Sequence, residues 1–229
     1  MEIVHEFAPD LWVVDGDPLR MFTIPFTTRM TVVRLRGDDL WLHSPVAPTR
    51  ERVNALRGLG RVRHLVAPNK IHSLGIAPWL EHNPDARVWV SPQFLQRHSV
   101  PGEVTTLGDL APAAWNGEIA QLPFRGSSVL DEMVFLHRSS RTLILTDLIQ
   151  KHDPGLQSGF WRIVKRLNAV LGDEGGTARD LRATFFDRAA ARESLVEMMN
   201  WDFDNLIISH GKCLRGSAKA EVKRAFEWL

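Results

Sequence analysis

The chain of 229 residues contains a single cysteine, Cys213, which excludes an intramolecular disulfide. Proteins without disulfides are typical of reducing compartments, so we expect a cytoplasmic protein. Residues 1–6 contain no basic segment leading into an apolar stretch, and we expect no secretory signal. No apolar run reaches the roughly 18 residues that a membrane-spanning helix needs, so we expect no transmembrane segment.

The chain also lacks an excess of charge of either sign, because its formal net charge is +1. Basic residues are scattered and do not interleave with aromatic residues, so we expect no nucleic-acid partner. No glycine-rich phosphate loop and no Gly-x-Ser-x-Gly nucleophile elbow is present. Hydrophobic residues make up 44% and charged residues 24%, which is ordinary for a globular protein. The length suits one large domain or two small ones, and we expect a single domain over residues 1–229.

The most informative pattern is a recurrence of short apolar runs that end in polar side chains able to bind a metal. The runs cover residues 63–68, 142–146 and 206–209, and they lead into His72, Asp147 and His210. Short apolar runs bounded by turn residues are typical of buried strands. Loops at the ends of such strands present reactive groups from a rigid scaffold. Three such endings in one domain therefore predict a site built from His72, Asp147 and His210.

The rest of the sequence predicts strands and helices that alternate in two successive groups. Strands are expected at residues 3–15, 29–42, 87–90, 119–123 and 132–137, and helices at 49–59, 74–80, 187–199 and 217–228. Residues 36–39 predict a hairpin turn with Gly37 at a position that tolerates positive φ. The order favours an α/β (α+β) fold in which two sheets pack together with helices outside.

Residues at about 150–186 differ from this pattern and predict a helical insertion. Phe160, Ile163, Val164 and Leu167 recur at helical spacing, and the glycine-rich residues 171–176 end the helix. Residues 151–192 contain eight Lys or Arg against five Asp or Glu. Two interpretations remain open: an insertion that lies over the site, or an ordinary cationic surface helix that covers the core.

The order of these elements resembles the metallo-β-lactamase superfamily, an αββα sandwich with its metal site at one edge of the sheets. Within it the chain is most similar to the DUF4336 type of family, in which three motifs recur. These motifs are Pro-Asn-x-x-His at residues 68–72, Ser-Arg-Thr-Leu-x-x-Thr-Asp at residues 140–147, and His-Gly at residues 210–211. The resemblance covers nearly the whole chain in element order.

The chain departs from the superfamily's signature loop, His-x-His-x-Asp-His. With the last histidine placed on His72, Ala67 and Asn69 stand at the first two histidine positions, and Ile71 stands at the aspartate position. The further histidine expected near residues 124–127 is also missing. The resemblance thus implies that the first metal site is lost. It implies that the second is kept as His72, Asp147 and His210, with Asp147 in the bridging position.

Two neutral imidazoles and one carboxylate are a sufficient ligand set for zinc, iron or manganese, with positions left for water or substrate. We therefore expect at most one divalent metal ion as cofactor. The alternative is that no metal binds. In that case the backbone and Asp147 satisfy the two histidines, and Asp147 serves only to cap the turn after its strand.

Five further residues are candidates for the site, each with an ordinary structural role as the alternative. Lys70 could anchor an anionic substrate, replace a lost metal charge or lie solvated at the surface. Asn69 could ligate weakly or form a turn, and His43 ends a strand where the superfamily has an acidic residue. Glu132 could supply the missing carboxylate, and Cys213 could be a soft ligand or a small buried residue. The remaining histidines, His152 among them, are assigned to the core or surface.

These residues support two main hypotheses for function. The first is a mononuclear metal-dependent hydrolase of a small molecule, with His72 and His210 holding the ion, Asp147 as ligand and base, and Lys70 as the cation near the reaction. The second is a non-catalytic module that binds a small anion through Lys70 and the basic residues 151–192, or offers a partner surface. An iron-dependent oxidoreductase is a third and weaker alternative, because such relatives use a full dinuclear site.

Overall fold

The structure is a computed structural model that describes residues 3–21 and 23–229. Its larger sheet has seven strands in the order β1-β2-β5-β6-β7-β8-β9. These strands are β1 (His5–Ala8), β2 (Leu11–Asp15), β5 (Arg29–Arg34), β6 (Asp39–His43), β7 (Arg61–Ala67), β8 (Arg87–Val90) and β9 (Val104–Thr106). The pairs from β1 to β6 are antiparallel and those from β6 to β9 are parallel, so the sheet is mixed.

The second sheet has four strands in the order β10-β11-β12-β13. They are β10 (Ile119–Pro123), β11 (Met133–His137), β12 (Thr142–Leu145) and β13 (Asn205–Ile208). Only β12 and β13 are parallel, so this sheet is mixed as well. A separate hairpin of β3 (Leu19–Met21) and β4 (Ile24–Phe26) belongs to neither sheet.

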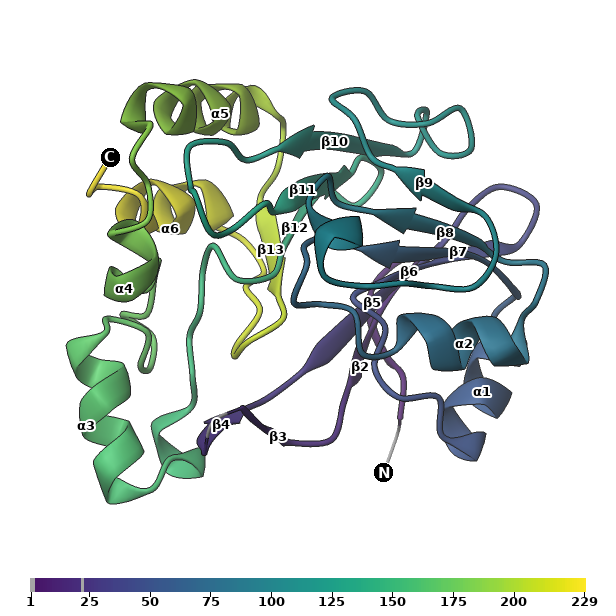
Figure 1. Cartoon of the computed structure of the whole chain (residues 1–229), viewed down its shortest axis with the longest axis horizontal. Coiled ribbons are helices and arrows are strands. Elements are labelled where there is room, and N and C mark those ends of the chain that lie inside the picture. Colours follow the sequence, from purple (N-terminus) through teal and green to yellow (C-terminus); the bar gives the residue numbers. More distant parts are fainter. Residues whose placement is uncertain (1–2, 22) are drawn as a thin grey trace.

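Helices lie on the outer faces of the two sheets (Figure 1). On one side are α1 (Arg50–Arg57) and α2 (Ile76–His82), and on the other are α5 (Arg188–Asn200) and α6 (Ala218–Ala225). Two further helices, α3 (Gly159–Leu167) and α4 (Arg179–Arg182), follow β12, and short 3-10 turns occur at Phe94–Gln96 and Pro154–Leu156. The sandwich of two mixed sheets with helices outside is the fold that the element order predicts.

Three apolar layers hold this sandwich together, and β6 shows how the sequence builds two of them. Successive side chains of a strand point to opposite faces of the sheet. Leu40 and Leu42 accordingly pack in the layer beneath α1 and α2, whereas Trp41 packs between the two sheets. Leu143 and Leu145 of β12 likewise pack in the third layer, against α5 and α6, while Ile144 faces the space between the sheets.

Both sheets contain parallel strands whose carboxyl ends carry the polar residues of the predicted site. In the larger sheet β6 and β7 are parallel, and they end at His43 and Ala67. In the smaller sheet the parallel strands β12 and β13 end at Leu145 and Ile208. Parallel strands bring their carboxyl ends to one edge, which is why residues distant in sequence meet there.

Most elements fall where the sequence predicts them, and the exceptions are short. The predicted turn at residues 36–39 is confirmed with Gly37 at φ +84°, and Thr49 caps α1 by accepting a hydrogen bond from the Arg52 backbone N–H. The β3–β4 hairpin and β9 lie outside the predicted strands. Each of these three strands has only three residues, too few to display a recognisable alternation.

The helix predicted within residues 150–186 is present as α3, but several of its apolar side chains are exposed. Phe160, Ile163 and Leu167 are each more than 60% exposed, whereas Lys165 is only 3% exposed. The Lys165 ammonium donates to the Pro25 carbonyl and lies 5.0 Å from the centre of the Phe26 ring. These three apolar side chains therefore do not cover the core, and Lys165 takes the inward position beside Pro25 and Phe26 of β4.

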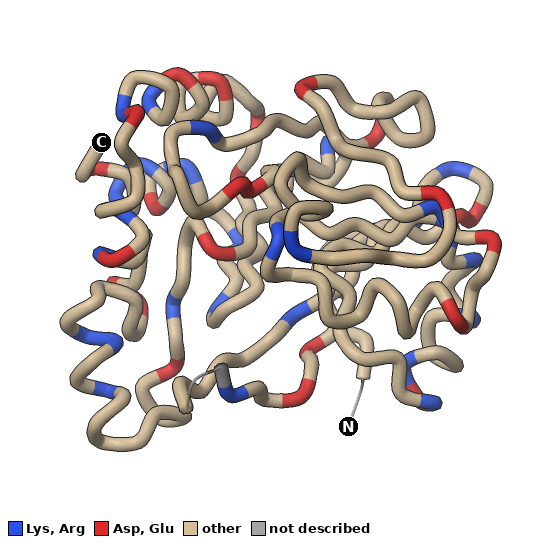
Figure 2. The backbone as a smooth tube through the Cα atoms, viewed as in Figure 1, with Lys and Arg blue, Asp and Glu red and all other residues tan. Residues whose placement is uncertain are grey.

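Charged residues of both signs occur along the whole chain, whereas all charged residues of α3 are basic (Figure 2). Within the described part of the chain, no helix combines the length and the hydropathy required to cross a membrane.

The His-Gly motif after β13 provides a test of the packing at the sheet edge. Gly211 has φ +118°, and a Cβ there would overlap the carbonyl of Lys151. We expect Gly211→Ala to lower the free energy of unfolding by more than about 3 kcal/mol, because strain and overlap add. The control Gly37→Ala has positive φ but open space around it. It should cost about 1 kcal/mol. Urea denaturation measures both, and equal losses would contradict the packing argument.

Candidate metal centre

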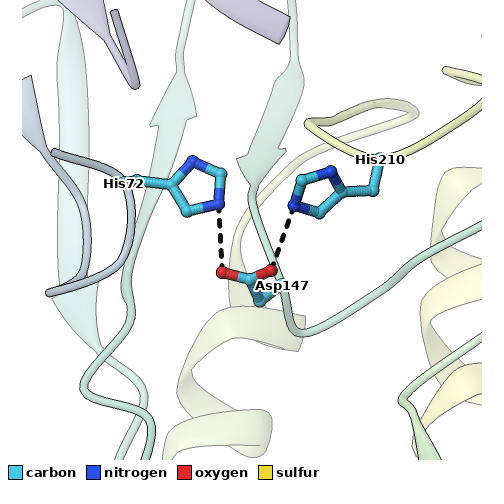
Figure 3. A group of neighbouring side chains, drawn as sticks. All are labelled: His72, Asp147 and His210. Carbon is cyan, nitrogen blue, oxygen red and sulfur yellow. Dashed lines mark ion pairs between the residues drawn. The ribbon is translucent and has the colours of Figure 1, made fainter. Parts of the chain in front are cut away.

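Three side chains from both sheets converge on one point (Figure 3). His72 lies in the loop after β7, Asp147 follows β12, and His210 follows β13. The His72 Nε2 atom is 3.1 Å from Asp147 Oδ2, and the His210 Nε2 atom is 3.2 Å from Asp147 Oδ1. One ligand atom from each residue lies within 4.8 Å of the other two. The structure thus brings together the three residues that the sequence analysis singles out.

The tautomer of the neutral His210 ring follows from its hydrogen bond to the backbone. Its Nδ1 atom is 2.6 Å from the carbonyl oxygen of Thr27. Because a carbonyl only accepts, Nδ1 must carry a proton, and in the neutral ring Nε2 then carries a lone pair. That lone pair faces the carboxylate of Asp147, so two acceptors meet unless a proton or a cation lies between them.

His72 is held in a similar way by a side chain of the neighbouring strand. Its Nδ1 atom is 2.5 Å from the hydroxyl oxygen of Ser44, the residue that follows β6 and adopts φ +53°. A hydroxyl can donate or accept, so this contact fixes the ring without fixing its tautomer. Outer hydrogen bonds of this kind orient imidazoles whose other nitrogen binds a metal.

Asp147 carries the negative charge of the centre and is only 5% exposed. Burial acts to raise the pKa of this carboxyl, but the charge of His72 and hydrogen bonds from His210 and His72 lower it well below its usual value. The carboxylate therefore stays ionised, and a buried ionised group requires compensation by positive charge. The two imidazoles supply it if protonated, and a divalent ion supplies it if they are neutral.

Asn69 lies beside the centre, and both the oxygen and the nitrogen of its side-chain amide form hydrogen bonds there. Its oxygen accepts hydrogen bonds from the backbone N–H groups of Ile71 and His72. Its nitrogen donates to Asp147 Oδ2 at 2.8 Å and to the Thr146 hydroxyl at 3.0 Å. The amide oxygen, the atom that could ligate, is directed at the loop. Asn69 therefore shapes the turn before His72 and orients Asp147.

Glu132 is fully buried beside the centre and faces the backbone instead of the ligand atoms. Its two carboxylate oxygens accept the backbone N–H groups of Thr146, Asp147 and Leu148 at 2.7, 2.7 and 3.2 Å. Burial and the charge of Asp147 raise its pKa to about 7, against the lowering effect of these hydrogen bonds. Glu132 thus holds the turn that presents Asp147, and it is not one of the three grouped ligands.

Lys70 lies in the loop that leads to His72, and its ammonium is held by a neighbouring amide. Its Nζ atom donates to Gln93 Oε1 at 2.7 Å. Asp131 braces this arrangement, since its carboxylate accepts the backbone N–H groups of both Lys70 and Gln93. Lys70 lines the same cavity as Asp147. The structure therefore places Lys70 at the cavity that Asp147 also lines.

His43 is buried directly before Ser44 and does not join the three ligands. It stacks on Trp41 with ring centres 5.4 Å apart. Neither of its nitrogens has a hydrogen-bond partner among residues 3–21 and 23–229. Burial, helped by the charge of His72, lowers the pKa of His43 to about 3. His43 is thus a neutral ring beneath the loop that holds His72.

Two further residues lie beside the centre: His152, which the sequence pattern assigned only to the core or surface, and Gln150, which had no predicted role. The Gln150 amide nitrogen approaches Asp147 Oδ1 at 3.4 Å. The His152 ring stacks on His210 with centres 6.0 Å apart, and its Nε2 atom lies 2.9 Å from Gln150 Oε1. Their only signal in the sequence is their position directly after Asp147, which does not reveal that the chain turns back over His210.

Arg29 of β5 ties the loop of His210 to the larger sheet. Its guanidinium donates to the carbonyl oxygens of Ile208 and Gly211, and to the Cys213 sulfur at 3.1 Å. Burial raises the pKa of the Cys213 thiol, against the opposing effect of Arg29. The sulfur is outside the group of three ligands. Cys213 thus belongs to the connection between the sheets.

A cavity of about 420 Å³ opens beside Asp147. Apolar side chains form most of its walls, among them Ile24, Phe26, Ile71, Val129, Val164 and Leu181. The residues after β12 thus form a wall of the cavity: Val164 and Lys165 come from α3, and Leu181 comes from α4. Residues 150–186 therefore contribute to the cavity beside Asp147.

Comparison with known proteins gives the chain a family context. A family model described as a domain of unknown function, DUF4336, matches residues 10–155. No curated protein matches the sequence.

Several solved structures share the fold over nearly the whole chain. TMB-1, described in terms of substrate and inhibitor binding, has 14% identity and a TM-score of 0.64, with 98% of this chain and 96% of TMB-1 covered. The metallo-β-lactamase FIM-1 from Pseudomonas aeruginosa, in a mono-zinc form, has 13% identity and a TM-score of 0.62, with 98% and 95% covered. The metal-soaked flavodiiron core of Flv1 from Synechocystis sp. PCC6803 has 15% identity and a TM-score of 0.67, with 98% of this chain and 60% of that chain covered.

The neutral state of His43 predicts a pH-dependent loss of stability. The unfolded chain binds a proton at His43 below its ordinary pKa of 6.5, whereas the folded protein does not until about pH 3. The unfolded state therefore binds more protons in this window, and stability falls as the pH falls. Between about pH 6 and pH 4, we expect the free energy of unfolding to fall more steeply in the wild type than in His43→Leu, by about 1.4 kcal/mol per pH unit. Urea denaturation at several pH values measures this, with the exposed His82→Leu as control. Parallel curves for the wild type and His43→Leu would contradict the prediction.

Proposed function

We propose that this chain, which belongs to the DUF4336 family, acts as a mononuclear metal-dependent hydrolase of a small anionic molecule. The observation that carries the proposal is the geometry of His210. Its protonated Nδ1 faces a carbonyl, so the lone pair of the neutral ring at Nε2 faces the Asp147 carboxylate at 3.2 Å. A cation between these atoms would turn an unfavourable contact between acceptors into a favourable one.

The donor set suits a divalent ion of the kind that imidazole and carboxylate bind together. His72, Asp147 and His210 would hold zinc, iron or manganese, which all accept this combination. Ser44 and Thr27 orient the two rings through Nδ1, as outer-shell partners of metal-bound histidines do. The centre is also buried, so its charges are poorly screened by water.

The surroundings favour one ion over two. Ala67 offers no ligand and packs beneath the helices, while the Asn69 amide is already used in both directions. Residues 124–128 contain no histidine. The FIM-1 structure, similar in fold, is described in a mono-zinc form, which supports the idea that this fold accommodates a single ion.

A divalent ion bound here would supply Lewis acidity that activates water and polarises a carbonyl or phosphoryl oxygen. The residues of the chain would do the rest. Asp147 would remain a negatively charged ligand and would be a poor proton acceptor, because the positive charge of a neighbouring ion favours the ionised form of a carboxyl group. Lys70 would face the negative charge that develops on the substrate, a role for which a fixed cation is effective in a cavity with apolar walls.

A second candidate function follows from the loss of the first-site ligands at Ala67 and Asn69. In this alternative the chain is a non-catalytic module that binds a small anion in the same cavity, with protonated histidines balancing Asp147. Metal content separates the two candidates.

We expect the purified protein to bind one divalent ion per chain, measured by elemental analysis after loading and desalting. His210→Ala should lose this ion, because only two ligands remain. The exposed His82→Ala is the matched control and should keep it. Two equivalents per chain would contradict the single-site proposal. No binding after loading with zinc, iron and manganese would favour the non-catalytic module.

Hydrolysis should depend on both the ion and Lys70. We expect weak turnover of standard β-lactam, thioester and phosphodiester substrates, because no second cation stabilises the developing oxyanion. Any activity found in a broader ester panel should fall about 100-fold or more in Lys70→Ala, and to background in His210→Ala. The exposed Lys223→Ala should match the wild type. Rapid hydrolysis that survives in Lys70→Ala would contradict the proposed role of this lysine.

A further inference from the structure

The orientation of α3 places a cation where helices usually bury apolar groups. Lys165 is 3% exposed, while Phe160 and Leu167 on the same helix are 67% and 65% exposed. Burying an ammonium costs free energy unless it finds acceptors or opposite charge. The inward position of Lys165 and the outward position of Phe160 therefore require a compensating group near the ammonium.

The protein itself satisfies only part of the Lys165 ammonium. The group has three N–H donors, and the Pro25 carbonyl accepts one of them. The face of the Phe26 ring lies 5.0 Å away and contributes a weak cation–π attraction. No carboxylate of the described residues forms an ion pair with Lys165. Burial lowers its pKa to about 8, so the side chain is still mostly protonated at neutral pH.

Lys165 lines the cavity beside the metal centre, and the acidic groups there do not offset its charge. The cavity contains two carboxylates, Asp147 and Asp180. Asp147 is paired with the two histidines, and exposed Asp180 accepts from the Leu181 backbone N–H at the start of α4. The cavity thus contains a buried positive charge without a negative partner.

The volume and the apolar walls of the cavity indicate what kind of molecule would fit beside Lys165. Its volume of about 420 Å³ is in the range of small-molecule sites, about 300–1,000 Å³. The walls near Lys165 include Phe26, Val164 and Val170, with Ile71 and Val129 also contributing apolar surface. Such walls favour a hydrocarbon body, whereas a small hydrophilic anion would leave them in contact with water.

We propose that this cavity binds an amphiphilic carboxylate, with the carboxylate group on the Lys165 ammonium and a hydrocarbon body of medium length along the apolar walls. The inference deepens the proposed function by naming the substrate class, and it rests on that function only for the role of the bound molecule as substrate or product. Binding itself requires Lys165 and the walls, and it does not require the ion.

Isothermal titration calorimetry with octanoate, octanol and acetate tests the two parts of the ligand separately. We expect octanoate to bind with one site per chain, and octanol and acetate to bind at least tenfold more weakly. Lys165→Met, which keeps the length of the side chain and removes its charge, should weaken octanoate binding at least tenfold. Lys223→Met, an exposed lysine of α6, should bind octanoate like the wild type.

Measurements of thermal stability and metal content distinguish the possible outcomes. Lys165→Met should be at least as stable as the wild type to heat, because methionine suits a buried position better than an unpaired ammonium does. It should also retain one ion per chain, and the wild type should bind octanoate after chelator treatment. Absent octanoate binding, equal binding of octanol, or unchanged binding in Lys165→Met would overturn the inference. If the wild type binds octanoate but binds no metal ion after loading, the proposed function would be contradicted and this inference would stand.

Discussion

The buried carboxylate of Asp147 is the constraint around which this edge of the molecule is organised. Two imidazoles, the amide of Asn69 and the amide of Gln150 all direct polar hydrogens or ring nitrogens at its two oxygens. An ionised group away from water is tolerated only with such compensation. The metal proposal and the alternative of protonated histidines are two ways to meet the same electrostatic requirement.

Holding that carboxylate in place takes contributions from both sheets and from the segment after β12. Glu132 fixes the turn of Asp147 through three backbone N–H groups, and Arg29 crosses from the larger sheet to the loop after β13. The backbone N–H of Lys151 donates to the His210 carbonyl, and its ammonium pairs with Glu221 of α6. The ligands of the centre are therefore anchored by backbone contacts in the surrounding elements.

Most of the fold and the three central residues could be predicted from the sequence, because the information for them is local. Apolar runs mark β7, β12 and β13, and the loop after each of these strands carries one of the three residues of the site. The partners of these residues could not be predicted. That Glu132 faces backbone amides, that His152 stacks on His210, and that Lys165 points inward all depend on how distant segments pack. The periodicity of α3 shows which residues share one side of the helix, but it does not show which side is buried.

The two-way hydrogen bonding of Asn69 has a consequence for substitutions at this position. A histidine at this position, as in the signature loop of the superfamily, would be a metal ligand. It could not both accept from the backbone of Ile71 and His72 and donate to Thr146 and Asp147. A mutation of residue 69 alone would thus disturb the remaining ligands before any second ion could bind. The turn that carries His72 and the orientation of Asp147 are therefore coupled through residue 69, and one substitution there changes both.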